Sequence, residues 1–196
     1  HPTEVRADWR QRTEALLALL DEEGVVAVGE TGIDLYWDAT WRCEQMEAFA
    51  LHLEGAAERA LPVIIHCREA LEPTLEVIAL HKERHGSLPT LIFHSFTGSS
   101  EDVARIREVC DPYFGINGVV TFKNAGPLSA AVPAIGIDRL LLETDSPYLA
   151  PVPRRGRRNE SAFLPYIRDK VAQLLLITPA EVERATDANV VKVFGP

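Results

Sequence analysis

Short apolar runs alternate with longer amphipathic stretches along the chain. The apolar runs predict strands at residues 25–28, 62–66, 90–94, 113–117 and 139–143. The longer stretches repeat apolar residues at helical spacing, and they predict helices over about 7–22, 40–60, 71–85, 161–176, 179–186 and 187–194. A further helix is predicted after the strand at 90–94, where Ser99 or Ser100 can cap its start. Strands that alternate with helices of such lengths indicate parallel βα units. The inward helix faces are expected to include Leu16, Leu17, Phe49, Leu53 and Ala57.

Four ionisable side chains stand where apolar runs end. Glu30 follows VVAVG, His66 follows LPVII, His94 follows TLIF and Asp145 follows LLLET. A charged or polar group at such a place costs desolvation unless a partner meets it, and convergence of the four would supply that partner. Helix capping or pairing with an arginine is the alternative for each carboxylate. A surface or core role is the interpretation for the three histidines on predicted helices, His52, His81 and His85.

Two carboxylates and two imidazoles are typical ligands of a divalent metal. Mixed nitrogen and oxygen donors suit zinc or manganese, or magnesium assisted by substrate phosphates. One carboxylate could bridge two such ions, which would polarise a phosphate and activate water between them. We therefore predict one divalent-metal site built by successive strands from Glu30, His66, His94 and Asp145.

The repeated placement of chemistry after strands also favours one fold class. Nearly continuous apolar strands indicate a sheet covered on both faces. In (β/α)8 barrels the functional residues follow strand after strand, whereas a doubly wound sheet binds ligands at one switch point. The chain contains no glycine-rich phosphate fingerprint that would support the second fold. The prediction is an α/β protein of the TIM (β/α)8 barrel class.

Composition sets the broad class of protein. With 196 residues and 46% hydrophobic residues, residues 1–196 are expected to form a single domain. No apolar run approaches the roughly 20 residues of a membrane span, and the N-terminus does not resemble a signal peptide. The three cysteines lack metal-binding spacing and favour a reducing, cytoplasmic location. Neither a membrane nor an obligate protein partner is expected.

The net charge and the local charge of the chain point to different substrates. The net charge of −9 argues mildly against nucleic acid, since phosphate binding normally needs a basic surface. Four arginines nevertheless lie within residues 154–158, about ten residues after Asp145. Arginines suit phosphodiesters because they bind phosphate with two hydrogen bonds. The candidate substrate-binding residues are Arg68, Ser95, Arg155 and Arg158, with a solvated loop or a helix cap as the alternative interpretation.

Five segments carry recognisable motifs: GETGID at 29–34, VIIHCREA at 63–70, FHSFTGS at 93–99, YFGING at 113–118 and LLETDSPYLAPVPRRGRRNE at 141–160. Together they resemble the TatD family of metal-dependent deoxyribonucleases. They occur in the order of the family and over the whole chain, and the last segment is the most specific. The resemblance implies a TIM barrel and a magnesium- or manganese-dependent nuclease, often a 3′-to-5′ exonuclease, with zinc as a possible metal.

The resemblance also implies roles for single residues. Glu30 is similar to the glutamate that bridges two metal ions in the family, and His66 and His94 are similar to two histidines on one of those ions. Asp145 resembles the aspartate that binds metal and orients the attacking water. Glu30 and Asp145 are therefore the expected catalytic residues, and two divalent ions are the expected cofactors.

One feature of the family is absent from this chain. The family begins with a strand that carries a His-x-His pair, which does not occur here. His1-Pro2 instead resembles the Gly-[Val/Ile]-His-Pro segment that ends the family's third strand. Since each βα unit of such a barrel takes about 31 residues, roughly 60–75 residues are expected to be missing upstream. Five strands alone would leave open sheet edges, so we expect an N-terminally incomplete barrel.

These observations lead to one expected function and two alternatives. The expected function is hydrolysis of phosphodiester bonds in DNA, at single strands or 3′ ends, by metal-activated water. A barrel hydrolase that cleaves a carboxylic ester, a lactone or an amide would use the same ligands, because metal-activated water also attacks carbonyl carbon. The other alternative is a non-catalytic, metal-stabilised fragment.

Overall fold

The computed structural model describes residues 1–195, which form two compact units. The N-terminal unit comprises residues 1–93 and 109–112, and the C-terminal unit comprises residues 94–108 and 113 onward. Both units consist of parallel strands and helices, which confirms the predicted α/β class. The single domain over residues 1–196 stays a prediction.

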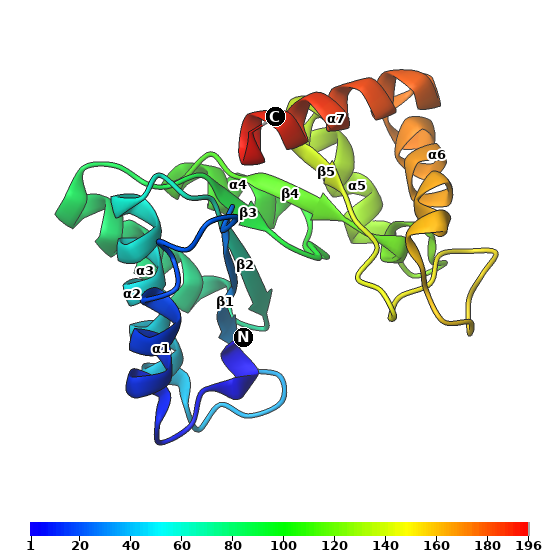
Figure 1. The fold of residues 1–196 in the computed structure, drawn as a ribbon. Helices are drawn as coiled ribbons and strands as arrows, with labels where there is room; N and C mark the ends of the chain where they lie inside the picture. Colours follow the sequence, from blue (N-terminus) through cyan, green and yellow to red (C-terminus); the bar gives the residue numbers. More distant parts are fainter. Residues whose placement is uncertain (196) are drawn as a thin grey trace. The chain divides into compact units, whose positions relative to one another are not determined.

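The N-terminal unit contains three parallel strands joined by helices (Figure 1). Its elements are η1 (Pro2–Glu4), α1 (Trp9–Leu17), β1 (Val28–Asp34), α2 (Arg42–Glu58), β2 (Val63–Arg68), α3 (Leu71–His85) and β3 (Leu91–Phe93). The pairing of β1 with β2 shifts register between Val28 and Thr31, and it then sets Gly32 opposite His66. Helix α2 packs on β1, with Phe49 and Leu53 fully buried.

The C-terminal unit contains two parallel strands and more helix (Figure 1). Its elements are α4 (Ser100–Val109), β4 (Tyr113–Ile116), η2 (Gly118–Thr121), α5 (Gly126–Ile135), η3 (Ile137–Arg139), β5 (Leu140–Leu142), η4 (Ser161–Phe163), α6 (Leu164–Leu175) and α7 (Pro179–Phe194). Residues 114–116 of β4 pair with residues 140–142 of β5. The core of this unit includes Phe114, Leu140 and Ile167, all fully buried.

Most predicted elements are present, and the helix over 71–85 has the predicted bounds. The cap before α4 is also confirmed, because the backbone N–H of Asp102 donates to Ser99 Oγ over 3.2 Å. The first strand begins at Val28 instead of residue 25 and continues to Asp34, and Val26 is 56% exposed. An apolar run therefore located this strand but not its bounds.

Three other details of the prediction were wrong. Leu16 and Ala57 are exposed, while Thr13, one turn before Leu16, and Ala56, next to Ala57, are buried. The predicted helices over 179–186 and 187–194 are one helix, α7, so Asp187 starts no new helix. Helix α5, which contains Pro133, was not predicted. Within residues 1–195, no helix is both long enough and apolar enough to cross a membrane.

Candidate functional site

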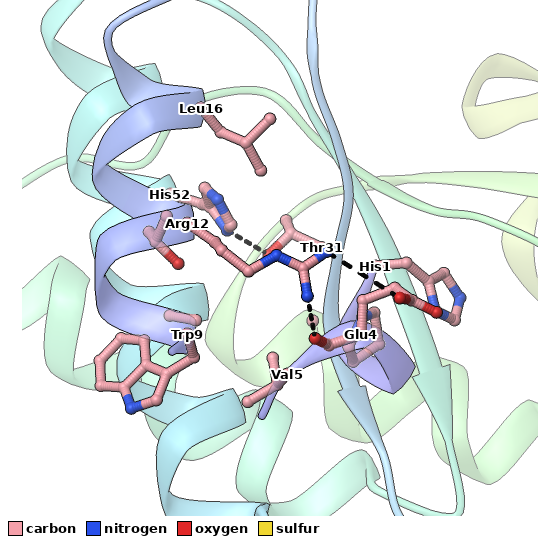
Figure 2. A pocket seen from close by; sticks show the side chains of 12 residues that line it. His1, Glu4, Val5, Trp9, Arg12, Leu16, Thr31 and His52 are labelled. Carbon is pink, nitrogen blue, oxygen red and sulfur yellow. Dashed lines mark hydrogen bonds and ion pairs between the residues drawn. The ribbon is translucent and has the colours of Figure 1, made fainter. Parts of the chain in front are cut away.

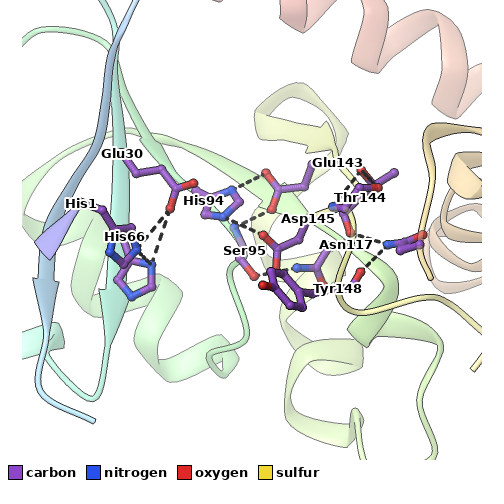
Figure 3. A network of polar contacts seen from close by, with 12 residues as sticks. His1, Glu30, His66, His94, Ser95, Asn117, Glu143, Thr144, Asp145 and Tyr148 are labelled. Atoms are coloured by element: carbon purple, nitrogen blue, oxygen red, sulfur yellow. Dashed lines mark hydrogen bonds and ion pairs between the residues drawn. The ribbon is translucent and has the colours of Figure 1, made fainter. Parts of the chain in front are cut away.

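His1, Glu30 and His66 form a compact group of metal-ligand types in the N-terminal unit, which we call the N-terminal cluster (Figure 3). His1 Nε2 lies 3.2 Å from His66 Nδ1. Oε2 of Glu30 lies 3.6 Å from His1 Nε2 and 3.7 Å from His66 Nδ1. Three donor atoms, two nitrogens and one oxygen, thus point toward one another from the N-cap of η1, from β1 and from β2.

The spacing of these three donors fits a bound divalent ion. Ligands held at about 2.1 Å around a tetrahedral ion lie about 3.4 Å from one another. The three measured separations of 3.2, 3.6 and 3.7 Å surround that value. Nitrogen and carboxylate donors suit zinc and manganese, and the carboxylate also suits magnesium. The N-terminal cluster could therefore hold a divalent ion without rearrangement of its backbone.

The strand pairing explains how the cluster forms. Glu30 lies inside β1, so the prediction that it follows its strand was wrong, whereas His66 lies in β2, as the predicted strand over 62–66 had it, although β2 continues to Arg68. Gly32 stands opposite His66 and has φ of +116°, and a Cβ there would lie 2.2 Å from the carbonyl oxygen of His66. Only glycine fits so close an approach at this φ. The GETG segment is thus shaped to bring Glu30 beside β2.

His1 was not predicted as a ligand, although its resemblance to the family's His-Pro segment was visible. Its Nδ1 accepts the backbone N–H of Thr3 over 3.2 Å and lies 2.7 Å from Thr3 Oγ1, so the other ring nitrogen, Nε2, is the one that faces Glu30 and His66. A cavity of about 120 Å³ next to it is lined by His1, Thr31 and His52 among others (Figure 2). Burial lowers the pKa of His52 to about 4, and Thr31 Oγ1 lies 2.8 Å from its Nδ1.

His94, Glu143 and Asp145 form a second group, the C-terminal cluster, in the C-terminal unit (Figure 3). Oε2 of Glu143 lies 3.1 Å from His94 Nδ1. On the other side of the ring, Oδ1 of Asp145 lies 3.5 Å from His94 Nε2, a separation that also fits two ligands of one ion. The ring of His94 is thus flanked by two carboxylates, one at each nitrogen.

Buried amides support the backbone around this cluster. Ser95 N–H donates to Glu143 Oε1 over 2.6 Å, and Ser95 Oγ accepts from the Asn117 side chain over 2.6 Å. Asn159 is 2% exposed, and its amide donates to the carbonyl oxygens of Thr144 and Tyr148 over 2.7 and 2.6 Å. These two bonds close the loop that carries Asp145. Neither Asn117 nor Asn159 was predicted, because an asparagine in a loop gives no signal of the carbonyl groups it will reach.

The predicted substrate-binding residues have different surroundings. The guanidinium of Arg68 stacks over Tyr36 at 3.8 Å, and that of Arg155 stacks over Phe122 at the same distance. Arg155 and Arg158 are exposed. Ser95 belongs to the support of the C-terminal cluster as described above. Contact of these four residues with a substrate stays a prediction.

Two predicted ligands thus lie in each unit, and in the structure each pair has further ionisable neighbours. The N-terminal cluster adds His1, and Asp34 behind His66 at 2.8 Å. The C-terminal cluster adds Glu143. A single site formed by all four predicted ligands stays a prediction.

Comparisons with known proteins agree with this class of site. The family model for TatD-related DNases matches residues 1–195. The chain is 40% identical over 186 residues to an uncharacterised metal-dependent hydrolase, YabD, of Bacillus subtilis, with 93% of this chain and 71% of that protein covered. It is 42% identical over 200 residues to a 3′-5′ ssDNA/RNA exonuclease TatD of Cronobacter sakazakii, with 99% and 74% covered.

A solved structure shows the same fold. The TatD homologue YJJV of Escherichia coli K12 matches with a TM-score of 0.85 and 25% identity over 100% of this chain and 74% of that chain. The α/β fold is thus consistent with the predicted TIM barrel. The fold, the family model and the relatives together define the class of metal-dependent hydrolases. The chain belongs to the TatD-related DNase family, which confirms the resemblance of its motifs.

Proposed function

We propose that this protein hydrolyses phosphodiester bonds of nucleic acid, single-stranded DNA in particular, with water activated by divalent metal ions. The observation that carries the proposal is the N-terminal cluster, in which three donors lie 3.2–3.7 Å apart. The relative from Cronobacter sakazakii is named a 3′-5′ ssDNA/RNA exonuclease, and this name supports cleavage from a 3′ end.

The residues of each cluster suggest their roles. His1, Glu30 and His66 would hold an ion in the N-terminal unit, and His94 and Asp145 would hold one in the C-terminal unit. A divalent ion at such donors lowers the pKa of water and polarises a phosphoryl oxygen. The side chain of Asp145 is 30% exposed, so we assign its carboxylate to orienting the attacking water and accepting its proton.

Substrate recognition in this proposal depends on the arginines. A guanidinium that stacks on an aromatic ring keeps its N–H groups at the rim, where they can donate to phosphate oxygens. Arg68 stacks on Tyr36 and Arg155 stacks on Phe122 in this manner. Arg158 is an exposed cation in the loop that carries Arg155. The locally basic loop would offset the net charge of −9 for a polyanionic substrate.

The test is hydrolysis of a 5′-labelled single-stranded DNA with magnesium, manganese or a chelator. We expect metal-dependent shortening from the 3′ end, and a rate roughly 100-fold lower or more in Asp145→Asn. The exposed carboxylate of Asp138 offers a matched control, since Asp138→Asn should cleave at the wild-type rate. A wild-type protein that binds metal but leaves DNA and RNA intact would contradict the proposal.

A second pair of variants tests whether Arg155 and Arg158 bind the substrate phosphates. Arg155→Ala with Arg158→Ala should lower kcat/KM on DNA roughly tenfold or more, because hydrogen bonds to charged groups are lost. The control is Arg84→Ala with Arg184→Ala, which removes two exposed arginines from α3 and α7 and so changes the net charge equally. An equal effect of both pairs would reduce the role of Arg155 and Arg158 to general charge.

A further inference from the structure

Asp34 is held on all sides at the end of β1. Its backbone N–H donates to the side chain of Gln45 over 2.8 Å, and the Gln45 amide donates back to the Asp34 carbonyl oxygen over 3.2 Å. Its Oδ1 accepts the backbone N–H groups of Tyr36 and Trp37 over 3.0 and 3.3 Å. The Asp34 side chain is 1% exposed. This carboxylate therefore has one remaining oxygen, Oδ2, and little freedom to turn.

That remaining oxygen determines which nitrogen of His66 carries the proton. Asp34 Oδ2 lies 2.8 Å from His66 Nε2. A carboxylate at neutral pH can only accept hydrogen bonds, so Nε2 must donate. A neutral imidazole has one N–H, and its lone pair then lies on Nδ1. Nδ1 is the atom that faces His1 and Glu30 in the N-terminal cluster.

Glu143 has the same relation to His94, with the nitrogens exchanged. Its Oε1 accepts the N–H of Ser95 over 2.6 Å, and its Oε2 lies 3.1 Å from His94 Nδ1. Nδ1 must therefore donate, which puts the lone pair on Nε2, the nitrogen that faces Asp145. Gly115 makes room for this carboxylate, since a Cβ there would lie 2.1 Å from Glu143 Oε2.

We propose that Asp34 and Glu143 are positioning residues that hold the two histidines in opposite tautomers, so that His66 binds metal through Nδ1 and His94 through Nε2. The proposal rests on the metal-binding part of the proposed function, and it does not depend on the substrate. Carboxylates behind metal-ligating histidines generally fix the ring and raise its basicity, and their loss typically costs 10–100-fold in metal affinity.

Isosteric amides give the sharpest variants. In Asp34→Asn the oxygen should stay on the backbone N–H groups of Tyr36 and Trp37, so the new NH₂ faces His66 Nε2. An NH₂ group can only donate, and the ring proton must then move to Nδ1, the atom that should bind metal. Glu143→Gln should do the same to His94, because Ser95 N–H keeps the amide oxygen. Both variants retain the shape of the side chain, remove one negative charge and should reverse the tautomer of the histidine behind which they lie.

The first measurement is the ¹⁵N chemical shift of the ring nitrogens in the metal-free protein at about pH 8, where an ordinary imidazole is neutral. The wild type should show the proton of His66 on Nε2 and that of His94 on Nδ1. Asp34→Asn should reverse the pattern of His66 alone, and Glu143→Gln that of His94 alone. A wild-type His66 protonated on Nδ1, or an unchanged pattern in Asp34→Asn, would overturn the proposal without reference to activity.

The second measurement is the affinity for Mn²⁺ by calorimetry. Each variant should bind roughly 10–100-fold more weakly than the wild type. Asp38→Asn is the matched control, four residues after Asp34. Asp38 accepts the backbone N–H of Thr40 and, among residues 1–195, has no hydrogen bond or ion pair with a histidine. Wild-type affinity in Asp34→Asn and Glu143→Gln would overturn the proposal. If His66 and His94 have the predicted tautomers but the protein cleaves no nucleic acid, only the proposed function is contradicted.

Discussion

Ser95 and Asp145 have backbone conformations that L-amino acids rarely adopt. Their φ angles are +49° and +57°, in the left-handed region. Such residues cost about 1–3 kcal/mol each and persist where the surroundings determine them, often at functional sites. Here Ser95 N–H is held by Glu143, and Asn159 closes the loop around Asp145. The residues of the C-terminal cluster are thus placed by their contacts, against their own local preference.

His52 gives a prediction about pH at the scale of one residue. Burial lowers its pKa from 6.5 to about 4, so below pH 6.5 the unfolded chain binds a proton that the folded protein does not. Stability contributed by the neutral ring is complete above pH 6.5 and is lost as the pH falls toward 4. The free energy of unfolding should drop by about 2–3 kcal/mol over that interval from this residue.

Urea unfolding at several pH values checks this prediction. His52→Gln should flatten the pH dependence between 6.5 and 4. His85→Gln should not, because the His85 side chain is 46% exposed. An identical slope in the wild type and His52→Gln would contradict the assignment.

At the scale of elements, the ends of strands and helices depend on contacts that the apolar pattern does not contain. Helix α7 begins at a capping box, in which Glu181 N–H donates to Thr178 Oγ1 and the Glu181 carboxylate accepts the N–H of Thr178. The sequence predicted this start, since Thr178-Pro179 is a strong helix signal. It could not predict that β1 continues through Glu30 to Asp34, because that extension depends on pairing with a strand more than 30 residues away.

The cap of α7 gives a prediction about stability. Thr178→Ala should lower the free energy of unfolding by about 1 kcal/mol, since the first-turn N–H of Glu181 loses its acceptor. Thr178→Ser should retain most of the stability, because serine keeps the hydroxyl group. Chemical denaturation of the two variants measures the difference. Equal losses in both would mean that the methyl group, and not the cap, matters.

Strand β4 gives a prediction about metal binding. Gly115→Ala would place a Cβ within 2.1 Å of Glu143 Oε2, so the carboxylate must swing away from His94. A glutamate side chain can move without unfolding the strand, so we expect near-normal stability and a Mn²⁺ affinity about tenfold lower or more. Gly126→Ala is the control, because no atom lies within 4 Å of its Cβ position. Unchanged affinity in Gly115→Ala would contradict the role of Glu143.

At the scale of the whole molecule, ligand binding and stability are coupled. A preformed donor set exists in the folded protein and is lost on unfolding, so a bound ion should stabilise the fold. At a free metal concentration 100 times its Kd, the free energy of unfolding should rise by about 2.7 kcal/mol. For a chain of this size that corresponds to an increase in Tm of roughly 5–10 °C.

Thermal unfolding with Mn²⁺ and with a chelator measures this coupling. His66→Ala should lose most of the increase in Tm, because it removes a central donor of the N-terminal cluster. His81→Ala removes a histidine of α3 outside both clusters and should keep the metal-dependent increase, even if its own Tm is lower. A Tm that does not respond to metal in the wild type would argue against the donor geometry of the N-terminal cluster.

The sequence by itself determined the class of fold, most of the elements and the four candidate ligands. Periodicity and turn signals are local, so α3 could be bounded from its own residues. The candidates Glu30, His66, His94 and Asp145 could be found because an ionisable residue beside an apolar strand is costly and therefore conspicuous. The motifs around them were also sufficient to indicate the family.

Only the tertiary structure decided how those ligands are presented. His1 meets His66 across 65 residues of sequence, and Asp34 meets it across 32. No local pattern encodes such contacts, because they depend on strand register, on the close approach at Gly32 and on loops closed by single amides. Which nitrogen of each histidine faces the metal follows from these contacts, since a ring's proton is placed by its hydrogen-bond partner and not by its neighbours in sequence.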